Sequence, residues 1–166
     1  DLTAAMGISR PSLYAAFGDK ASLFLSALDH YRKSPASYVN RALAQPTALE
    51  AFKGLLSGVI DLVTDPKNPG GCLFVCASLP ANVEPEPVTK ELARRRLDGE
   101  RDIAKRFRKA AREGDLPPDA DPKALAKLAA TLMWGISVQS TSGSTRAELL
   151  KIADLAIGAF PKTEKR

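Results

Sequence analysis

The chain has 166 residues, 45% of them hydrophobic and 26% charged, which is ordinary for a folded globular protein of one or two domains. It contains no run of about eighteen apolar residues, so neither a membrane-spanning helix nor a membrane partner is expected. Two cysteines, Cys72 and Cys76, are too few for a disulfide framework, and these features together favour the cytoplasm.

The net charge of +5 is unevenly distributed along the chain. Between Lys90 and Glu113, ten basic and five acidic side chains give an excess equal to the whole net charge, whereas residues 1–33 have an excess of only one. Three interpretations of this basic segment are open: a second surface that binds nucleic acid, a patch that binds an acidic membrane, or a helix face exposed to solvent. Its interspersed acids favour a solvated face with ion pairs between residues four apart. Net charge alone is therefore weak evidence for DNA binding.

Residues 1–33 are predicted to form three short helices. Ser9 caps the second helix, which tolerates Pro11 in its first turn and ends at Gly18. Asp19 caps the third helix. The first helix ends at Gly7 and has an apolar face of Leu2, Ala5 and Met6. The third has a core stripe of Phe24, Ala27, Leu28 and Tyr31.

The rest of the chain predicts further helices and an all-α fold. Thr47 and Glu50 form a capping box that opens a helix buried on more than one side. The apolar run 72–79 is compatible with either a helix or a strand. A long charged helix follows, from about Val88 to Glu113. The last two helices begin after the cap Asp121 and after the capping box of Thr145 and Glu148.

The first two helices meet at a turn with a characteristic composition. Gly7 permits a tight turn with positive φ, and Ile8 is an apolar residue that packs beneath such a turn. This order is typical of a helix-turn-helix, in which the second helix enters the major groove of DNA. The generic pattern is weak, because pairs of amphipathic helices are common in helical proteins.

The amino-acid sequence of this segment resembles the DNA-binding segment of the TetR family of bacterial transcription regulators. The shared features are a small-residue turn, the pair Leu13 and Tyr14, then Phe17, and Lys20 at the start of the next helix. The stretches 71–75 and 114–117 also look like one bacterial branch of the family. The family's first helix is absent here, so the molecule is expected to be longer than this chain.

The resemblance implies a partial helix-turn-helix domain over residues 1–33 and a helical ligand-binding and dimerisation domain over 34–166. It implies a ligand-responsive repressor that binds a pseudo-palindromic double-stranded DNA operator as a homodimer. Arg10 is placed to read a guanine, Tyr14 and Lys20 to hold phosphates, and Leu13 and Phe17 to support the fold. The expected DNA contacts are Thr3, Ser9, Arg10, Pro11, Ser12, Tyr14 and Lys20. The ordinary alternatives are a core aromatic at Tyr14 and a solvated lysine at Lys20.

The resemblance also implies an effector cavity and a dimer interface in the second domain. The effector is expected to be small, neutral and mainly apolar, with Ser137 and Gln139 as polar groups; the alternative is a filled core. The expected cavity residues are Leu55, Val59, Leu62, Phe74, Ile103, Phe107, Met133 and Trp134. The last two helices are expected to pair with the same helices of a second copy. The alternative is that the apolar faces of both helices pack only into the core of their own chain. The expected interface residues are Leu125, Leu128, Leu132, Ile136, Leu149, Ile152, Ala156 and Phe160.

Catalytic and metal chemistry find little support in the sequence. Cys72 and Cys76 share a helix face if that run is helical, but two thiols without clustered histidines make a poor zinc site, so buried, inert cysteines are expected. His30 is the only histidine and has no nucleophile motif near it. No cofactor is expected. The alternatives to a DNA-binding regulator are a helical interaction module without DNA binding and, less favoured, an enzyme.

Overall fold

The computed structural model describes residues 2–77 and 86–163, with the side chains of residues 86 and 87 excepted. All regular elements in these ranges are helical. In chain order they are α1 (Leu2–Met6), α2 (Arg10–Phe17), α3 (Lys20–Lys33), the 3-10 helix η1 (Pro35–Ser37), α4 (Tyr38–Leu43), α5 (Ala48–Thr64), α6 (Leu73–Cys76), α7 (Glu86–Arg112), α8 (Pro122–Thr141) and α9 (Arg146–Ala159). None of the described helices is both long and apolar enough to cross a membrane.

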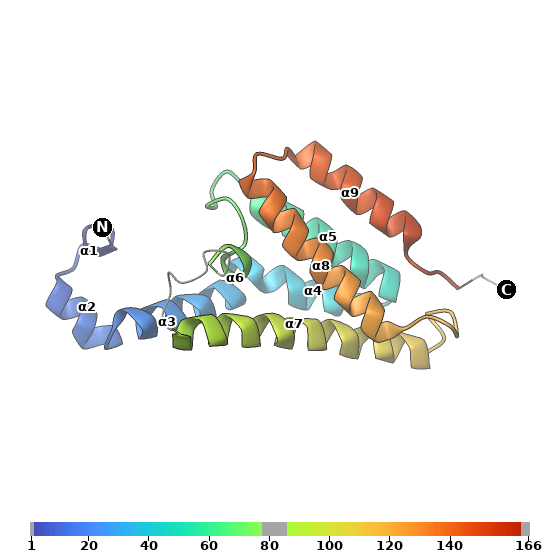
Figure 1. Ribbon diagram of the computed structural model, residues 1–166, viewed down its shortest axis with the longest axis horizontal. Coiled ribbons are helices and arrows are strands. Elements are labelled where there is room, and N and C mark those ends of the chain that lie inside the picture. Colours follow the sequence, from blue (N-terminus) through green and yellow to red (C-terminus); the bar gives the residue numbers. More distant parts are fainter. Residues whose placement is uncertain (1, 78–85, 164–166) are drawn as a thin grey trace.

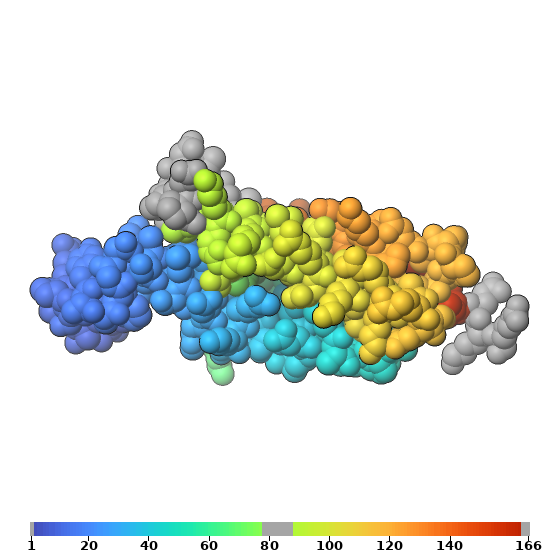
Figure 2. Space-filling model, turned by 90° about the horizontal axis from the view of Figure 1, so that it is seen from below, coloured from blue at the N-terminus to red at the C-terminus, as the bar shows by residue number. Residues whose placement is uncertain are grey.

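The helices form an elongated molecule with a slender end and a thicker body (Figure 1). Helices α1 and α2 lie at the slender end, and α3 leads from them into the body. Helix α7 runs along one side of the body and packs against α8, which crosses obliquely in front of α5, while α9 lies at the opposite side (Figure 1). From below, the two N-terminal helices project beyond the rest of the molecule (Figure 2).

Helix α5 is the centre of the main core. The side chains of Phe52, Leu55, Leu56 and Ile60 are fully buried, and they point to different sides of the helix. This agrees with the prediction that the helix is buried on more than one side. It packs against α4, α8 and α9, and an ion pair between Arg146 and Asp61 (2.6 Å) fixes the start of α9 to it.

Two glycines of α5 allow α4 to approach the helix backbone. A Cβ atom on Gly54 would lie 3.0 Å from Cβ of Ala42, and one on Gly58 would lie 2.2 Å from Cδ2 of Tyr38. Any larger residue at Gly58 would therefore displace the Tyr38 ring. The sequence did not predict η1 and α4, so this packing was also missed.

A second, smaller core joins the slender end to the body. Leu28 of α3 is completely buried with Val88 and Leu92 of α7. Beyond this core, Arg95 of α7 forms an ion pair of 2.7 Å with Asp29 of α3. The side chain of Arg95 is only 10% exposed, so solvent screens this pair less than a surface pair.

Most of the predicted helix starts are confirmed. The side chains of Ser9, Asp19 and Asp121 accept a backbone N–H at the starts of α2, α3 and α8. The capping boxes of Thr47 with Glu50 and Thr145 with Glu148 are both formed. The undecided run 72–79 contains the short helix α6, while its positions 78 and 79 lie outside the described residues. Ala27, expected in the core stripe of α3, is exposed because that stripe is narrower than predicted.

Candidate DNA interface and effector cavity

The turn between α1 and α2 has the geometry of a helix-turn-helix. Gly7 has a φ of +63°, in the left-handed region that favours glycine. Its N–H donates to the carbonyl of Ala4 (3.3 Å), and the N–H of Ile8 donates to the carbonyl of Thr3 (3.1 Å). Ser9 then starts α2, and its Oγ accepts from the N–H of Ser12 at 3.2 Å. These bonds fix the angle at which α2 leaves α1.

Helix α2 presents polar and aromatic side chains to solvent. Leu13 is buried, whereas Tyr14 is 52% exposed, which excludes the alternative of a core aromatic at that position. Phe17 is half-buried on the inner side. The expected contact residues of α2 and its cap are all exposed: Ser9, Arg10, Pro11, Ser12 and Tyr14. Thr3, in α1, is half-buried.

Lys20 is the first residue of α3 and is exposed. A cation at a helix N-terminus is unfavourable, because the helix dipole places partial positive charge there. The preceding cap, Asp19, accepts the N–H of Ser22 at 2.7 Å, and this bond holds the pKa of its carboxyl below the usual range. The Asp19 carboxylate therefore satisfies the N-terminal end of α3, and Lys20 extends into solvent beside it.

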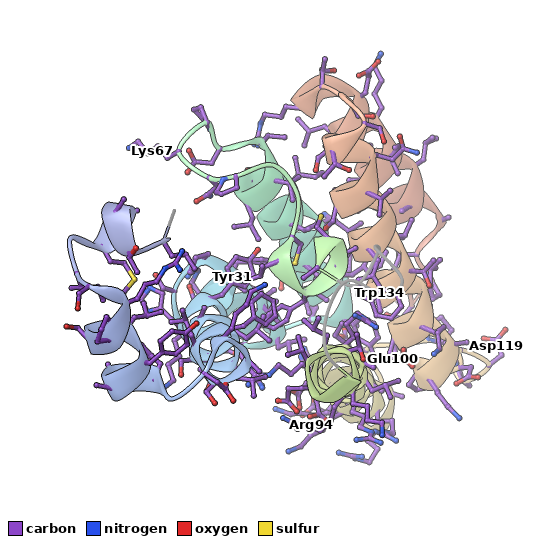
Figure 3. The ribbon with its side chains drawn as sticks, turned by 60° about the vertical axis from the view of Figure 1, so that its left-hand side comes forward. Tyr31, Lys67, Arg94, Glu100, Asp119 and Trp134 are labelled. Carbon is purple, nitrogen blue, oxygen red and sulfur yellow. The ribbon has the colours of Figure 1, made fainter. Side chains whose placement is uncertain are left out.

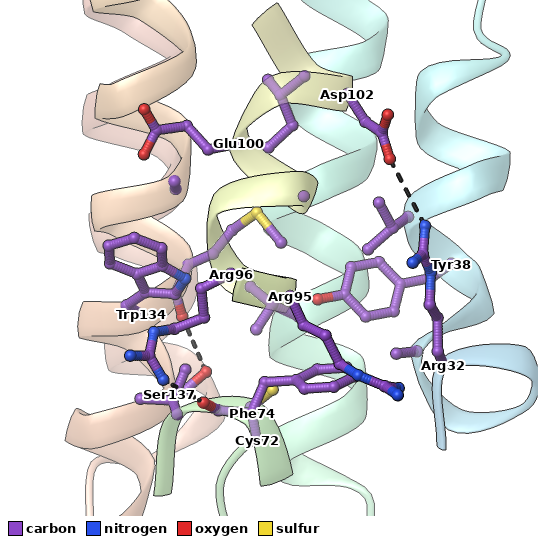
Figure 4. A pocket seen from close by; sticks show the side chains of 18 of the residues that line it. Arg32, Tyr38, Cys72, Phe74, Arg95, Arg96, Glu100, Asp102, Trp134 and Ser137 are labelled. Carbon is purple, nitrogen blue, oxygen red and sulfur yellow. Dashed lines mark hydrogen bonds and ion pairs between the residues drawn. The ribbon is translucent and has the colours of Figure 1, made fainter. Parts of the chain in front are cut away.

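The body contains a cavity of about 120 Å³ between α3, α4, α5, α6, α7 and α8. Figure 4 shows its walls, with α8 on one side and α3 and α4 on the other. Figure 3 shows Trp134 between α8 and α7, whereas Arg94 lies on the outer side of α7. Six residues expected at the cavity line it: Val59, Phe74, Ile103, Met133, Trp134 and Ser137.

Four expected residues lie elsewhere. Leu55, Leu62 and Phe107 belong to the main core, and Phe107 packs edge-on against Phe160 with ring centroids 5.7 Å apart. Gln139 is exposed. Helical periodicity places residues on a face, but it does not say which part of a broad face borders a void.

Charged side chains also border the cavity, which the sequence did not predict. Two of them have ion-pair partners in or beside the cavity: Arg32 lies 3.6 Å from Asp102, and Glu100 lies 2.9 Å from Lys127, which is outside the lining. Arg96 donates to the carbonyl of Phe74 at 3.1 Å, and burial lowers the pKa of its guanidinium. The cavity is therefore an apolar space with a rim of compensated charge.

Sequence reasoning missed one buried polar group in the wall. Tyr38, the first residue of α4, lines the cavity and is only 8% exposed. Burial, followed by the nearby Cys72 and Tyr31, raises the pKa of its phenol, so the hydroxyl keeps its proton. The sequence does contain a signal for the helical turn that carries this residue. It consists of Pro35 followed by apolar side chains at Tyr38, Val39 and Ala42.

The last two helices divide their apolar residues between the core and the surface. Ile136, Leu149 and Phe160 lie inside the protomer's own core, where a second copy does not reach them; Phe160 stacks on Phe52 at 4.6 Å. Leu125, Leu132 and Ala156 are half-buried, while Leu128 and Ile152 are exposed. Two further leucines of α9, Leu150 and Leu155, are also exposed. The uncovered apolar surface of these two helices comprises Leu128 on α8 and the neighbouring Ile152 and Leu155 on α9, whereas Leu150 points to another side of α9.

The two cysteines lie at the ends of α6, with Cys72 as its N-cap and Cys76 as its last residue. Both cysteines are free thiols; Cys72 is buried, and this burial raises the pKa of its thiol. Within the described ranges, no three His, Cys, Asp or Glu side chains are grouped as metal ligands. On α7, ion pairs such as Arg94 with Asp98 (2.6 Å) confirm the prediction of a solvated, ion-paired helix face.

Sequence comparison relates this fold to known regulators. A family described as "Tetracyclin repressor-like, C-terminal domain" matches residues 48–149. The chain is 24% identical to the HTH-type transcriptional repressor ComR of Escherichia coli (strain K12), over 99% of this chain and 80% of ComR. It is 32% identical to the HTH-type transcriptional regulator YezE of Bacillus subtilis (strain 168), over 57% of this chain and 47% of YezE.

A solved structure extends the similarity over almost the whole chain. A cysteine variant of the TetR family transcriptional regulator CifR, complexed with 26-base-pair double-stranded operator DNA, superposes with a TM-score of 0.90. The identity is 38%, over 96% of this chain and 84% of that chain. The family match covers more than half of the sequence and agrees with the helix-turn-helix and the helical body. This chain belongs to the TetR family of transcriptional regulators.

Proposed function

We propose that this protein is a DNA-binding transcriptional repressor that acts as a homodimer and responds to a small molecule. Residues 1–33 form the DNA-reading unit, and residues 34–166 form the effector-binding and dimerising unit. The observation that carries the proposal is the exposed face of α2 behind a tight glycine turn, in a chain similar over most of its length to a regulator solved on operator DNA. Its place of action would then be the bacterial cytoplasm.

The exposed residues of α2 have side chains suited to DNA. Arg10 lies in the first turn, where a guanidinium can donate two hydrogen bonds to a guanine in the major groove. The hydroxyl of Tyr14 and the ammonium of Lys20 are donors for phosphate oxygens, which position a protein on DNA without reading its sequence. The exposure of Lys20 at the start of α3, directly after α2, supports this role because its ammonium is accessible to a phosphate.

The uncovered apolar surface of α8 and α9 supports dimerisation. Leu155 is 76% exposed, and Leu128 and Ile152 are also accessible to solvent. Burying these side chains against the same surface of a second copy removes apolar area from water. A two-fold axis would also match the two halves of a pseudo-palindromic operator.

The position of the cavity supports a response to an effector. Arg32, Arg95 and Asp102 border it, and the first two belong to ion pairs that join α3 to α7. A ligand in the cavity therefore lies next to the contacts that orient the DNA-reading unit. To lower DNA affinity, it must bind more tightly to a conformation in which the two recognition helices are wrongly spaced.

DNA titration at several salt concentrations tests the proposal. Tyr14→Phe and Lys20→Ala should weaken binding to operator and scrambled DNA alike, and Lys20→Ala should reduce the salt slope by about one. Arg10→Ala should instead relax sequence preference, at a cost of about 1–3 kcal/mol. Lys123→Ala is the matched control, because Lys123 is also an exposed lysine in the first turn of a helix, α8, but outside the DNA-reading unit.

Two results would argue against this function. If none of the three variants changes the affinity for either DNA, α2 is not the reading helix. If the wild-type chain binds no DNA and shows no salt dependence, the alternative of a helical interaction module is favoured.

A further inference from the structure

We infer that the cavity takes a small, neutral, mainly apolar molecule with a hydrogen-bond acceptor, and that the hydroxyl of Tyr38 donates to that acceptor. This inference rests on the proposed effector function and specifies the chemistry of its ligand. The key residue is a buried donor that the folded chain leaves without an acceptor.

The hydroxyl of Tyr38 lies in the cavity wall without a partner of its own. The residue is 8% exposed, its oxygen is accessible from the cavity, and no group in the described part of the chain forms a hydrogen bond with it. Figure 4 shows the ring extending from α4 with its oxygen directed toward the middle of the cavity. Buried hydroxyl groups are normally hydrogen-bonded. An acceptor group on a ligand in the cavity would take the place of the water that can otherwise reach this oxygen.

The direction of this hydroxyl is fixed by the packing of the ring. The Tyr38 ring lies directly on the α5 backbone at Gly58, where a Cβ atom would come within 2.2 Å of its Cδ2 and 2.6 Å of its Cγ. The ring therefore has no room to move toward α5. A donor held in this way is organised before the ligand binds, so binding costs little side-chain entropy.

Other polar groups around the cavity are already engaged or hydrated. The Oγ of Ser137 donates to the carbonyl of Met133 at 2.8 Å, within its own helix. Arg96 donates to Phe74, and Trp134 is half-exposed, so water can satisfy its indole N–H. These groups differ from Tyr38, whose hydroxyl faces the cavity without a protein partner.

The size and charge of the cavity restrict the ligand further. A cavity of about 120 Å³ is somewhat smaller than the ~150 Å³ apolar cavity that holds benzene in another protein, so a ring of about six or seven heavy atoms fits. The rim charges of Arg32, Asp102 and Glu100 are compensated within the protein. An ionic ligand would lose its hydration on entering this mainly apolar space, which is unfavourable. A neutral ring with a carbonyl group satisfies these conditions.

Two probes of nearly equal shape isolate the hydrogen bond. Cyclohexanone carries a carbonyl oxygen where methylenecyclohexane carries a CH₂ group. Calorimetric titration of each into the wild-type protein should show a preference for the ketone of about two- to twelve-fold, the range of a neutral hydrogen bond. Tyr38→Phe keeps the ring but removes the hydroxyl, so this preference should fall to about one.

Tyr31→Phe is the matched control. Tyr31 is also a partly buried phenol beside Cys72, but its oxygen accepts from the N–H of Leu73 at 3.4 Å, and it does not line the cavity. This variant should keep the ketone preference. In the wild-type protein, the carbonyl stretching frequency of bound cyclohexanone should lie below its value in hydrocarbon solvent. This readout does not depend on the folding of any variant.

The inference is overturned if neither probe binds, if the wild type has no ketone preference, or if Tyr38→Phe retains it. An unshifted carbonyl frequency has the same consequence. DNA binding of the probe-free protein is measured separately. Loss of the ketone preference with intact DNA binding refutes only the ligand chemistry, whereas absence of DNA binding refutes the proposed function.

Discussion

The apolar surface on α8 and α9 gives a quantitative prediction for Leu155→Asp. Fully burying a leucine side chain contributes about 1.5–3 kcal/mol. Because Leu155 is 76% exposed in the single chain, its burial in a dimer should contribute about 1.1–2.3 kcal/mol per protomer. A two-fold interface uses each residue twice. The substitution should therefore cost about 2–4.5 kcal/mol per dimer, or a factor of about 30 to 2000 in the dissociation constant.

Sedimentation equilibrium over a range of protein concentrations measures this dissociation constant directly. Leu97→Asp is the matched control, because Leu97 is another exposed leucine (48%) but lies on α7, among the charged residues of that helix. This variant should leave the dimer unchanged, which separates the interface from a general effect of added charge. An unchanged dissociation constant for Leu155→Asp, or equal dissociation of both variants, would refute the assignment of this surface.

Two stability predictions follow from the packing of the body and the charge pairs of α7. Phe160→Ala removes a ring that stacks on Phe52 at 4.6 Å, so the free energy of unfolding should fall by about 3–5 kcal/mol; a loss below about 1 kcal/mol in urea titration would contradict this packing. Arg94 and Arg95 hold the pKa of Glu91 at about 2, below its ordinary value of 4.5. The contribution of the ionised Glu91 to the free energy of unfolding is therefore complete above pH 4.5, and it is lost as the pH falls toward 2. Glu91→Gln should reduce the slope of unfolding free energy against pH in this range, and an unaltered slope would exclude the pair as its source.

Local signals in the sequence predicted most of the helix starts. A cap such as Ser9 or Asp121 acts within three residues, so the side chain and the N–H that it accepts are both visible in the sequence. The same holds for the Thr47 capping box and for the positive φ of Gly7. The short helix α4 was missed because it has no side-chain cap, and its helical turns depend on packing against Gly54 and neighbouring positions of α5.

The neighbours of each helix face were harder to predict than the faces themselves. Phe107 and Val59 both lie on apolar stripes, but only Val59 borders the cavity. Leu149 and Ile152 occupy the same short helix, yet the first is fully buried in the core and the second is exposed. A helical stripe fixes the direction of a side chain relative to its own axis. It does not specify whether a void, a core or a second chain lies in that direction.

Helix α3 contacts α7 beside the cavity, so a small rotation of α3 at this contact displaces its N-terminal end, and the proposed DNA-reading unit with it, by a larger distance. Helix α3 has 14 residues, so it is about 21 Å long at 1.5 Å per residue. Leu28, which is fully buried with Val88 and Leu92, anchors α3 to α7 near its C-terminal end. A tilt of about 5° at its C-terminal end moves its other end by about 2 Å. In a two-fold dimer the opposite arm moves as well, so the distance between the recognition helices changes by up to about 4 Å, against the ~34 Å separation of successive major grooves. A ligand no larger than a single ring would then need to shift only a few side chains to alter operator affinity.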